Sequence, residues 1–334
     1  MKFVFGFTLF LLTGFTLGNE ILNSKEYSSS FNVMDYGAVG DGKVDDSQLG
    51  GTLIAPESTS WTDGQVAVWI QFSSVENLIL DGGGTIDGQG SIWWQPCMKT
   101  SIFGFYFDCN RRPTALHFNN CNGLRLKGLT HLNSPMLHIS INACKDVVVS
   151  NLHIKAPEDS PNTDGIDIAD SSNVQIQDST IGTGDDCVAI NGGSCFINIT
   201  GVNCGPGHGI SVGSLGDGPY DTVEEFHVKN CNFSNTQNGV RIKTFQGMGK
   251  LHSYEILQKA TAIQVSDVTY SDIQGTSASD RAIDLDCDKV VGCSNIVMNN
   301  VQITRSGTGP QIYGSCNNAH GTAINVQPEV PCLS

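Results

Sequence analysis

Three carboxylates and an imidazole recur along the chain at nearly equal intervals. The interval from Asp164 to Asp186 is the same as that from Asp186 to His208. Asp185 directly precedes Asp186. If one turn of a repetitive fold takes about this length, the three positions fall on neighbouring parallel strands about 4.8 Å apart. The spacing therefore predicts that these acidic and imidazole side chains share one face of the molecule.

Such a cluster is suited to acid and base catalysis. Hydrolysis of a glycoside uses one carboxyl group to protonate the leaving oxygen and another to activate water. Repulsion between crowded carboxylates keeps one of them protonated at working pH. Arg241, which follows His208 after a longer interval, and Lys243 can pair with the carboxylates of a charged sugar. The pattern favours hydrolysis of an acidic polysaccharide.

Asp185 and Asp186 pose a geometric problem, because consecutive side chains of a regular strand point to opposite faces. Both reach one site only if the backbone bends between or beside them. Gly182 and Gly184 flank the pair and permit such a bend. We therefore expect an irregularity in the strand that begins here.

Two other interpretations of these residues stay open at the level of sequence. Solenoid proteins stack Asn, Asp and Ser in their turns, so any single aspartate can serve as a turn residue. A calcium site is a second alternative, which the nearby Arg241 and Lys243 disfavour. The remaining histidines, among them His131 and His138, are expected on solenoid faces or in loops.

The elements that must position this cluster are short β-branched runs of similar composition. The runs that start at 124, 147, 174 and 197 are nearly evenly spaced. A run at 78 precedes the one at 124 by twice the usual step, which predicts two coils between them. This period predicts a right-handed parallel β-helix of a single chain, with an antiparallel β-sandwich as the alternative. The runs are 78–81, 124–127, 147–150, 174–177, 197–200, 226–229, 263–266 and 296–299.

Two places break the rhythm. The step from 226 to 263 is too long for one coil and too short for two. Residues 31–48 read as a first strand and turn, and 49–54 follow at once without a helix that would cap the open core.

The N-terminus has the pattern of a secretory signal peptide. Lys2 precedes an apolar run from Phe3 to Leu17, which is too short to span a bilayer. We expect a signal peptide at 1–18, a β-helix domain at 19–334, and a protein secreted to the extracellular space. In that compartment the 12 cysteines of the chain suggest disulfides, and their even number permits full pairing without requiring it. Asn198 and Asn232 begin candidate glycosylation sequons.

Charge and composition narrow the choice of partners. The net charge of −15 argues against nucleic acid, and no later stretch is apolar enough to span a membrane. An anionic substrate is repelled at long range unless a local basic group attracts it. We expect a monomer without membrane partners.

Four motifs, in this order, resemble those of the polygalacturonases, the pectin-degrading glycoside hydrolases of family 28, and of their plant members in particular. The resemblance covers most of the chain, from Phe31 to Cys332. The motifs are Asn162-Thr163-Asp164-Gly165, Gly184-Asp185-Asp186-Cys187, the run from Gly207 to Ser214, and Arg241-Ile242-Lys243-Thr244.

The resemblance implies a pectin-lyase-like parallel β-helix and inverting hydrolysis of α-1,4-galacturonosyl bonds in the homogalacturonan of the cell wall. Asp185 matches the general acid, and Asp164 and Asp186 match the residues that activate water. His208 matches the residue that tunes the protonation of the acid. No metal and no organic cofactor is implied.

The same resemblance assigns residues around the catalytic group. Arg241 and Lys243 match binders of the substrate carboxylate, and Asn162 is expected to bind substrate with them. Cys187 and Cys204 stand where the family places a disulfide that braces the site. Cys316 and Cys332 form a plausible second pair.

The chain departs from the family at two places, near 48–50 and within 247–261. Plant members carry a long stretch with a capping helix at the first place, and a coil with a substrate-contacting tyrosine at the second. We interpret both as internal losses. They raise one alternative to a polygalacturonase, a non-catalytic or weakly active pectin-binding protein. A hydrolase of rhamnogalacturonan or xylogalacturonan is a second alternative, which Arg241 and Lys243 disfavour.

Overall fold

The computed structural model describes residues 50–56, 67–94, 112–216, 221–245 and 263–333. The predicted signal peptide, the predicted first strand within 31–48 and the predicted loss at 247–261 lie outside these ranges. Within these ranges the regular structure is β-strand except for one short 3-10 helix, η3 (Gly90–Ile92). None of the helices in the described ranges is long and apolar enough to cross a membrane.

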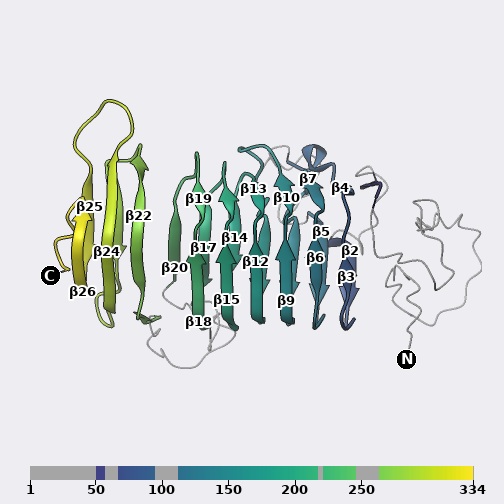
Figure 1. The fold of residues 1–334 in the computed structure, drawn as a ribbon, viewed down its shortest axis with the longest axis horizontal. Helices are drawn as coiled ribbons and strands as arrows, with labels where there is room; N and C mark the ends of the chain where they lie inside the picture. Colours follow the sequence, from purple (N-terminus) through teal and green to yellow (C-terminus); the bar gives the residue numbers. More distant parts are fainter. Residues whose placement is uncertain (1–49, 57–66, 95–111, 217–220, 246–262, 334) are drawn as a thin grey trace, which may run out of the picture. The chain divides into compact units, whose positions relative to one another are not determined.

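The described residues fall into two compact units, one within Met1–Gly213 and Tyr220–Lys243, the other within Ser214–Pro219 and Thr244–Ser334. The first unit is built from three parallel sheets whose strands succeed one another coil by coil (Figure 1). Successive coils contribute strands to these sheets in turn, so that strands three apart in the numbering are neighbours. This arrangement is a parallel β-helix.

In each of the three sheets the strands lie side by side in chain order. The first sheet contains β1 (Thr52–Ile54), β4 (Thr85–Asp87), β7 (Thr130–Leu132), β10 (His153–Lys155), β13 (Thr180–Gly182), β16 (Asn203–Cys204) and β19 (Asn232–Phe233). The second sheet contains β2 (Val68–Ser73), β5 (Thr114–Asn119), β8 (Ile139–Asn142), β11 (Ile166–Ala169), β14 (Asp186–Ile190), β17 (Gly209–Leu215) and β20 (Val240–Thr244). The third sheet contains β3 (Ile79–Leu80), β6 (Arg125–Lys127), β9 (Lys145–Ser150), β12 (Ser172–Gln177), β15 (Ser194–Thr200) and β18 (Val223–Lys229).

The third sheet is the repeat that the sequence predicts. Its strands contain the runs at 147–150, 174–177, 197–200 and 226–229, and β6 covers all but the first residue of the run 124–127. All of these strands pair in parallel, which excludes the β-sandwich. One detail of the prediction was wrong. Ile79 of β3 pairs directly with Arg125 of β6, so the long interval between these runs is a single coil with an excursion and not two coils.

Along these strands, side chains that point into the core alternate with side chains that point outward. In β12, Val174 and Ile176 are fully buried, and they pair with Ile197 and Ile199 of β15, which are equally buried. Each such aliphatic side chain contributes about 1.5–3 kcal/mol by leaving water. The intervening side chains point outward, which leaves the outer face of every sheet open to polar residues.

The third-sheet strands share a backbone feature at their starts. Asp146, Asn173, Phe196 and Glu225 occupy equivalent positions, and all four have a left-handed backbone, with φ between 52° and 59°. Asn and Asp tolerate this conformation because their short side chains bond locally, and Asn173 Nδ2 donates to Asp146 Oδ1 of the coil before, 2.6 Å away. Phe196 and Glu225 are neither Asn nor Asp, and Phe196 fits least well, because its bulky ring gains little there while 57% of the residue stays exposed.

The second unit is also built from parallel strands. One sheet contains β21 (Val265–Ser266), β22 (Thr269–Ser277), β24 (Cys293–Arg305) and β26 (Ala319–Gln327), and a second pairs β23 (Arg281–Asp286) with β25 (Tyr313–Asn317). The predicted run 296–299 lies within β24, and β21 covers the second half of the run 263–266. Disulfides join Cys287 to Cys293 and Cys316 to Cys332, the second of which is the pair that the resemblance implied.

Two histidines expected on faces or in loops, His131 and His138, are buried instead, so that expectation was wrong. His131 is 1% exposed in β7, between Ile86 of β4 and Ile154 of β10. Neither of its ring nitrogens has a hydrogen-bond partner among the described residues. Burial, assisted by His138, lowers the pKa of His131 to about 3.

Phe196→Asn is expected to raise the free energy of unfolding by about 1 kcal/mol, because it removes a strained bulky residue from a left-handed position without opening the core. Urea denaturation followed by circular dichroism measures the change. The reverse substitution at the equivalent position, Asn173→Phe, should lower stability. Equal or reduced stability of Phe196→Asn would contradict this account.

His131→Leu is expected to make folding less sensitive to acid. In the unfolded chain His131 is protonated below about pH 6.5, whereas its pKa in the native state is about 3. Between these two values the free energy of unfolding therefore falls by roughly 1.4 kcal/mol for each unit by which the pH is lowered. Leucine does not titrate and fits the aliphatic surroundings. Urea denaturation at several pH values measures the free energy of unfolding of both proteins. The variant should become more stable relative to the wild type as the pH falls. A difference in stability that does not change with pH would contradict this expectation.

Candidate active site

The predicted catalytic and basic residues meet on the outer face of the second sheet, at four neighbouring strands. They lie at or just before the starts of the first three strands and within the fourth. Asp164 precedes β11, Asp185 directly precedes β14, Asp186 begins β14, His208 precedes β17, and Arg241 and Lys243 lie in β20. All of them belong to the first unit.

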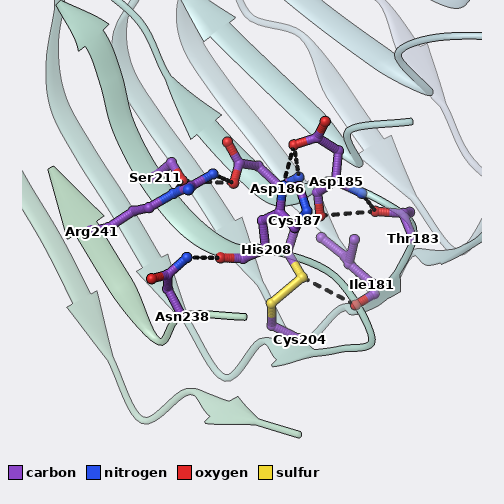
Figure 2. The surroundings of a disulfide bond; sticks show 10 residues. All are labelled: Ile181, Thr183, Asp185, Asp186, Cys187, Cys204, His208, Ser211, Asn238 and Arg241. Atoms are coloured by element: carbon purple, nitrogen blue, oxygen red, sulfur yellow. Dashed lines mark hydrogen bonds and ion pairs between the residues drawn. A yellow bond between two sulfur atoms is a disulfide. The ribbon is translucent and has the colours of Figure 1, made fainter. Parts of the chain in front are cut away.

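A β-bulge at the start of β14 provides the bend that the sequence required. Asp186 pairs with Gly209 of β17 and Val188 pairs with Ile210, so Cys187 is an extra residue in β14. A bulge re-aims side chains next to it, and here the carboxyl groups of Asp185 and Asp186 both lie among the polar groups of the site (Figure 2). Cys187 turns into the core, where it forms a disulfide with Cys204, as the resemblance implied.

The bulge also changes the predicted stacking of the histidine. The equal spacing along the chain placed His208 beside Asp186, but β14 carries an extra residue relative to β17 at this point. His208 lies beside Asp185 instead, and its backbone N–H donates to the Asp185 carbonyl over 2.8 Å. The expected ladder of Asp164, Asp186 and His208 is therefore wrong by one position at its last step.

Asp185 is oriented by two donors. Its Oδ1 lies 2.8 Å from His208 Nδ1 and accepts the backbone N–H of Asp186 over 2.9 Å (Figure 2). The side chain of Asp185 is 20% exposed and that of His208 is 35% exposed. The bonded oxygen is thus fixed, while the carboxyl group stays within reach of a ligand.

Asp186 has a different environment. It is 2% exposed, and its Oδ1 accepts hydrogen bonds from Ser211 Oγ and Arg241 Nη2, both over 2.7 Å. Lys243 Nζ lies 3.2 Å from Oδ2, and Arg241 Nε donates to Ser211 over 2.7 Å. The two basic residues predicted to bind substrate therefore also stabilise the charge of a buried carboxylate.

Asp164 and a further aspartate, Asp167, complete a group of four carboxyls. Burial, and then the nearby carboxylates of Asp167, Asp185 and Asp186, hold the pKa of Asp164 well above its usual value. Burial raises the pKa of Asp167 to about 7, with Asp186 as the next largest cause. The site therefore retains protons at mildly acidic pH.

The sequence-based prediction did not include Asp167. It lies in β11, where Ile166 and Ile168 point into the core and Asp167 points outward. The signal was present in the sequence, since Asp167 alternates with two isoleucines directly after the first acidic motif.

A buried arginine fixes the loop that carries the first motif. Arg112 Nη1 donates to the carbonyls of Pro135 and Pro161, 3.1 Å and 2.6 Å away, and Nη2 donates to Asn162 Oδ1 over 2.6 Å. Asn162, predicted to bind substrate, is held here by Arg112 in a left-handed conformation with φ 54°.

The same loop packs against the second motif. Thr163 Oγ1 accepts the backbone N–H of Gly184 over 3.1 Å and is hydrogen-bonded to Ser160 Oγ over 2.7 Å. A Cβ atom at position 184 would collide with the backbone of Ser160, so only glycine fits. The two acidic motifs are therefore joined through backbone contacts before any substrate is present.

One group of donor atoms in the described residues is close enough to hold a metal ion. It consists of Asp185, Asp186 and His208, whose atoms lie within 4.8 Å of one another. Asp186 is already paired with Arg241 and Lys243, which disfavours a second cation at the same carboxylate. The donors are better arranged for proton transfer than for coordination.

The predicted glycosylation residues lie outside this group. Asn198 and Asn232 are exposed in β15 and β19 of the other two sheets. Cys316 and Cys332 belong to the second unit.

Two plant proteins are similar to this chain over much of its length. A probable polygalacturonase of Arabidopsis thaliana is 39% identical over 403 aligned positions, which cover 98% of this chain and 83% of the relative. Because that alignment is longer than this chain of 334 residues, the relative has residues without a counterpart here. Polygalacturonase-2 of Solanum lycopersicum is 38% identical, and the alignment covers 80% of this chain but only 64% of the relative.

A solved structure shares the fold. The endo-xylogalacturonan hydrolase of Aspergillus tubingensis superposes with a TM-score of 0.64 and is 25% identical. The superposition covers 85% of this chain and 81% of the hydrolase.

A family model spans both units. The model of the glycosyl hydrolases family 28 matches residues 45–257 and 251–326, which include the four motifs and every residue of the acidic cluster. Together with the plant relatives, this match shows that the chain belongs to the glycosyl hydrolases family 28.

Proposed function

We propose that this protein hydrolyses α-1,4-galacturonosyl bonds of pectin by an inverting acid and base mechanism. The observation that carries the proposal is the contrast between two adjacent aspartates. Asp185 is held by an imidazole and partly exposed, whereas Asp186 is buried between a hydroxyl and two cationic side chains. Two carboxyls in unlike environments can take the acid and base roles that glycoside hydrolysis needs. The names of the plant relatives support the choice of bond.

In this mechanism Asp185 donates a proton to the leaving oxygen. His208 holds one carboxyl oxygen of Asp185, so the other oxygen is available to carry that proton. Asp164 and Asp186 activate the attacking water: Asp186, whose charge Arg241 and Lys243 stabilise, accepts its proton, and Asp164 helps to orient it. Water attacks from the face opposite the leaving group, which inverts the anomeric carbon.

The basic residues link recognition to catalysis. Arg241 and Lys243 compensate the charge of Asp186 and lie where a substrate carboxylate can share them. Asn162, held by Arg112, presents its remaining polar atoms toward the substrate. Since both cations contact a catalytic carboxylate, binding of a galacturonate unit and activation of water are coupled.

Two exposed glycosylation sequons and the disulfides support export of the protein to the cell wall. Residues 1–18 act as the signal peptide and the β-helix of 19–334 as the secreted domain. Asn198 and Asn232 are exposed and accessible to glycosylation. Disulfides such as Cys187–Cys204 form in oxidising compartments. The enzyme acts as a monomer on homogalacturonan.

Two other functions have an observation in their favour. Hydrolysis of xylogalacturonan is favoured by the structural likeness to a hydrolase of that polymer. Binding without turnover is favoured by the residues that the Arabidopsis relative has and this chain lacks. Arg241 and Lys243, beside the acids, favour a carboxylated sugar at the cleavage point and so the first proposal.

Asp185→Asn is expected to lower kcat on polygalacturonate at least about 100-fold, because it removes the proton donor. Release of reducing ends at mildly acidic pH measures the effect. The matched control is Glu224→Gln, which removes the same charge from an exposed position of β18 in the third sheet. Full activity of Asp185→Asn would overturn the assignment.

Chromatography of the wild-type digest then separates the candidate functions. Galacturonate alone indicates exo action, and mixed oligomers indicate endo action. Products from xylogalacturonan but none from polygalacturonate would favour the second function. Binding of oligogalacturonate without product from either polymer would favour the third.

Arg112→Met is expected to lower kcat/KM by up to about 100-fold, because it releases Asn162 and the loop beside Gly184 from their fixed positions. Arg112→Lys, which keeps the charge but loses the planar fork, should retain intermediate activity. Thermal unfolding of both variants reports whether the fold survives. A variant with unaltered kcat/KM would show that the loop needs no such anchor.

A further inference from the structure

Phe196 has a backbone and an environment that suit its side chain poorly. Its φ is 57°, and among the described non-glycine residues with a left-handed backbone it is the one aromatic residue. The equivalent residues of the two neighbouring coils, Asn173 and Glu225, are polar and exposed, so neither offers the ring an apolar surface. A large exposed ring in a strained conformation points to a contact outside the core of the protein.

The residues that follow Phe196 form a glycosylation sequon. Asn198 is its first residue and Thr200 its last. Phe196, Asn198 and Thr200 point to the same side of β15, because Ile197 and Ile199 between them are fully buried. Residues two apart on one face of a strand are about 6.6 Å apart along the chain. A group attached to the side chain of Asn198 therefore begins within reach of the ring.

The face of the sheet around Asn198 leaves room for an attached sugar. β15 is an inner strand of the third sheet, where Asn198 pairs with Gln175 of β12 and His227 of β18. Asn198 and His227 are exposed, and Gln175 is half-buried. A sugar on Asn198 thus lies over a polar strand face, with Phe196 as the aromatic side chain nearest to it along β15.

A sugar and a phenyl ring can pack face to face. One face of a pyranose presents C–H groups, which are apolar and slightly positive. The face of an aromatic ring is apolar and electron-rich, so the two surfaces attract each other and exclude water. A sugar that covers Phe196 would bury the ring that the protein itself leaves exposed.

We infer that Asn198 carries an N-linked glycan whose first N-acetylglucosamine stacks on the ring of Phe196 and stabilises the β-helix. The inference rests on the proposed export of the protein, and not on its hydrolytic activity. The glycan comes from a lipid-linked diphosphate donor. The bond from C1 of the sugar to the diphosphate breaks, C1 bonds to Asn198 Nδ2, and the amide loses one proton as the diphosphate leaves.

Phe196 then has opposite effects on the two forms of the protein. In the chain without a glycan its ring is strained and exposed, and the gain in stability expected for Phe196→Asn applies to this form. In the glycoprotein the same substitution also removes the surface on which the sugar stacks. The gain from Phe196→Asn should therefore be smaller with the glycan than without it, or reverse in sign.

The second sequon provides a matched control within the chain. Asn232 is exposed at the start of β19, on another sheet. The residue two positions before it is Asn230, which is also left-handed, with φ 54°, but has no aromatic ring. A glycan on Asn232 lacks the stacking surface at this position, so its removal should not depend on Phe196.

The test is a cycle of variants of the full chain, secreted from a eukaryotic host and unfolded by heat at one scan rate. Mass spectrometry of peptides first measures the glycan occupancy of Asn198 and Asn232. Asn198→Gln should lower the melting temperature by about 2 °C, for a stacking contact as strong as an aromatic pair. In the Phe196→Asn background it should have little effect, whereas in Phe196→Tyr, which keeps the ring, it should act as in the wild type.

Enzymatic trimming tests the same contact without a further substitution. An endoglycosidase that leaves one N-acetylglucosamine on each asparagine should preserve the melting temperature of the wild type, because the first sugar alone meets the ring. Complete removal of the glycans should lower it as Asn198→Gln does. Asn232→Gln should change the melting temperature equally in the wild type and in Phe196→Asn.

Three results would overturn the inference. The first is a secreted protein without a glycan on Asn198, and the second is an effect of Asn198→Gln that is the same in the wild type and in Phe196→Asn. Both leave the proposed hydrolysis of polygalacturonate intact, since release of reducing ends is measured separately. The third is a chain that stays in the cell without glycans, in which case the proposed export fails and this inference fails with it.

Discussion

Each coil of the first unit can bond to the next only where equivalent residues lie one above the other. This register fixes which side chains enter the core and which face outward, and the left-handed positions at the strand starts reset it in every coil. Val174 and Ile176 stack on Ile197 and Ile199 because Asn173 and Phe196 turn the chain at the same point. Because the active-site residues lie on these regularly paired strands, the repeated register fixes their positions relative to one another.

The site itself depends on one local departure from the register. The extra residue Cys187 lets Asp185 and Asp186 serve the same face, and the disulfide to Cys204 anchors the bulge in the core. The two carboxyls then acquire opposite surroundings, an imidazole for one and two cations for the other. A regular strand would have buried one of them and separated the pair.

Much of this arrangement could be predicted from the sequence, because spacing reports register directly. The runs of the third sheet and the common face of Asp164 and Asp186 follow from nearly constant intervals, whereas Arg241 and Lys243 were assigned to the site by the family resemblance. The same reasoning failed at two places, because a residue count reveals neither a loop nor a bulge. The long stretch from β3 to β6 forms one coil with an excursion. The bulge in β14 places His208 beside Asp185. Asp167 was missed because alternation shows that a residue faces outward but not which neighbours it meets.

The buried histidines show a second limit. Composition places a histidine on a surface by default, and only the neighbours Ile86 and Ile154 reveal that His131 is enclosed. Arg112 is a similar case, since its partners Pro135 and Asn162 are distant from it in the sequence. Long-range contacts of this kind are set by tertiary packing, which local pattern does not encode.

The coil-by-coil pairing has a consequence for how such a chain can change over evolutionary time. Each coil contacts only the coil before it and the coil after it. A whole coil can therefore be inserted or deleted without changing the pairing register of the others. The stretch from β11 to β20 is different, because Asp164, Asp186, Ser211 and Arg241 come from four successive coils. Deleting any one of these would shift half of the catalytic group by a full strand spacing, so variation in length is confined to the coils on either side.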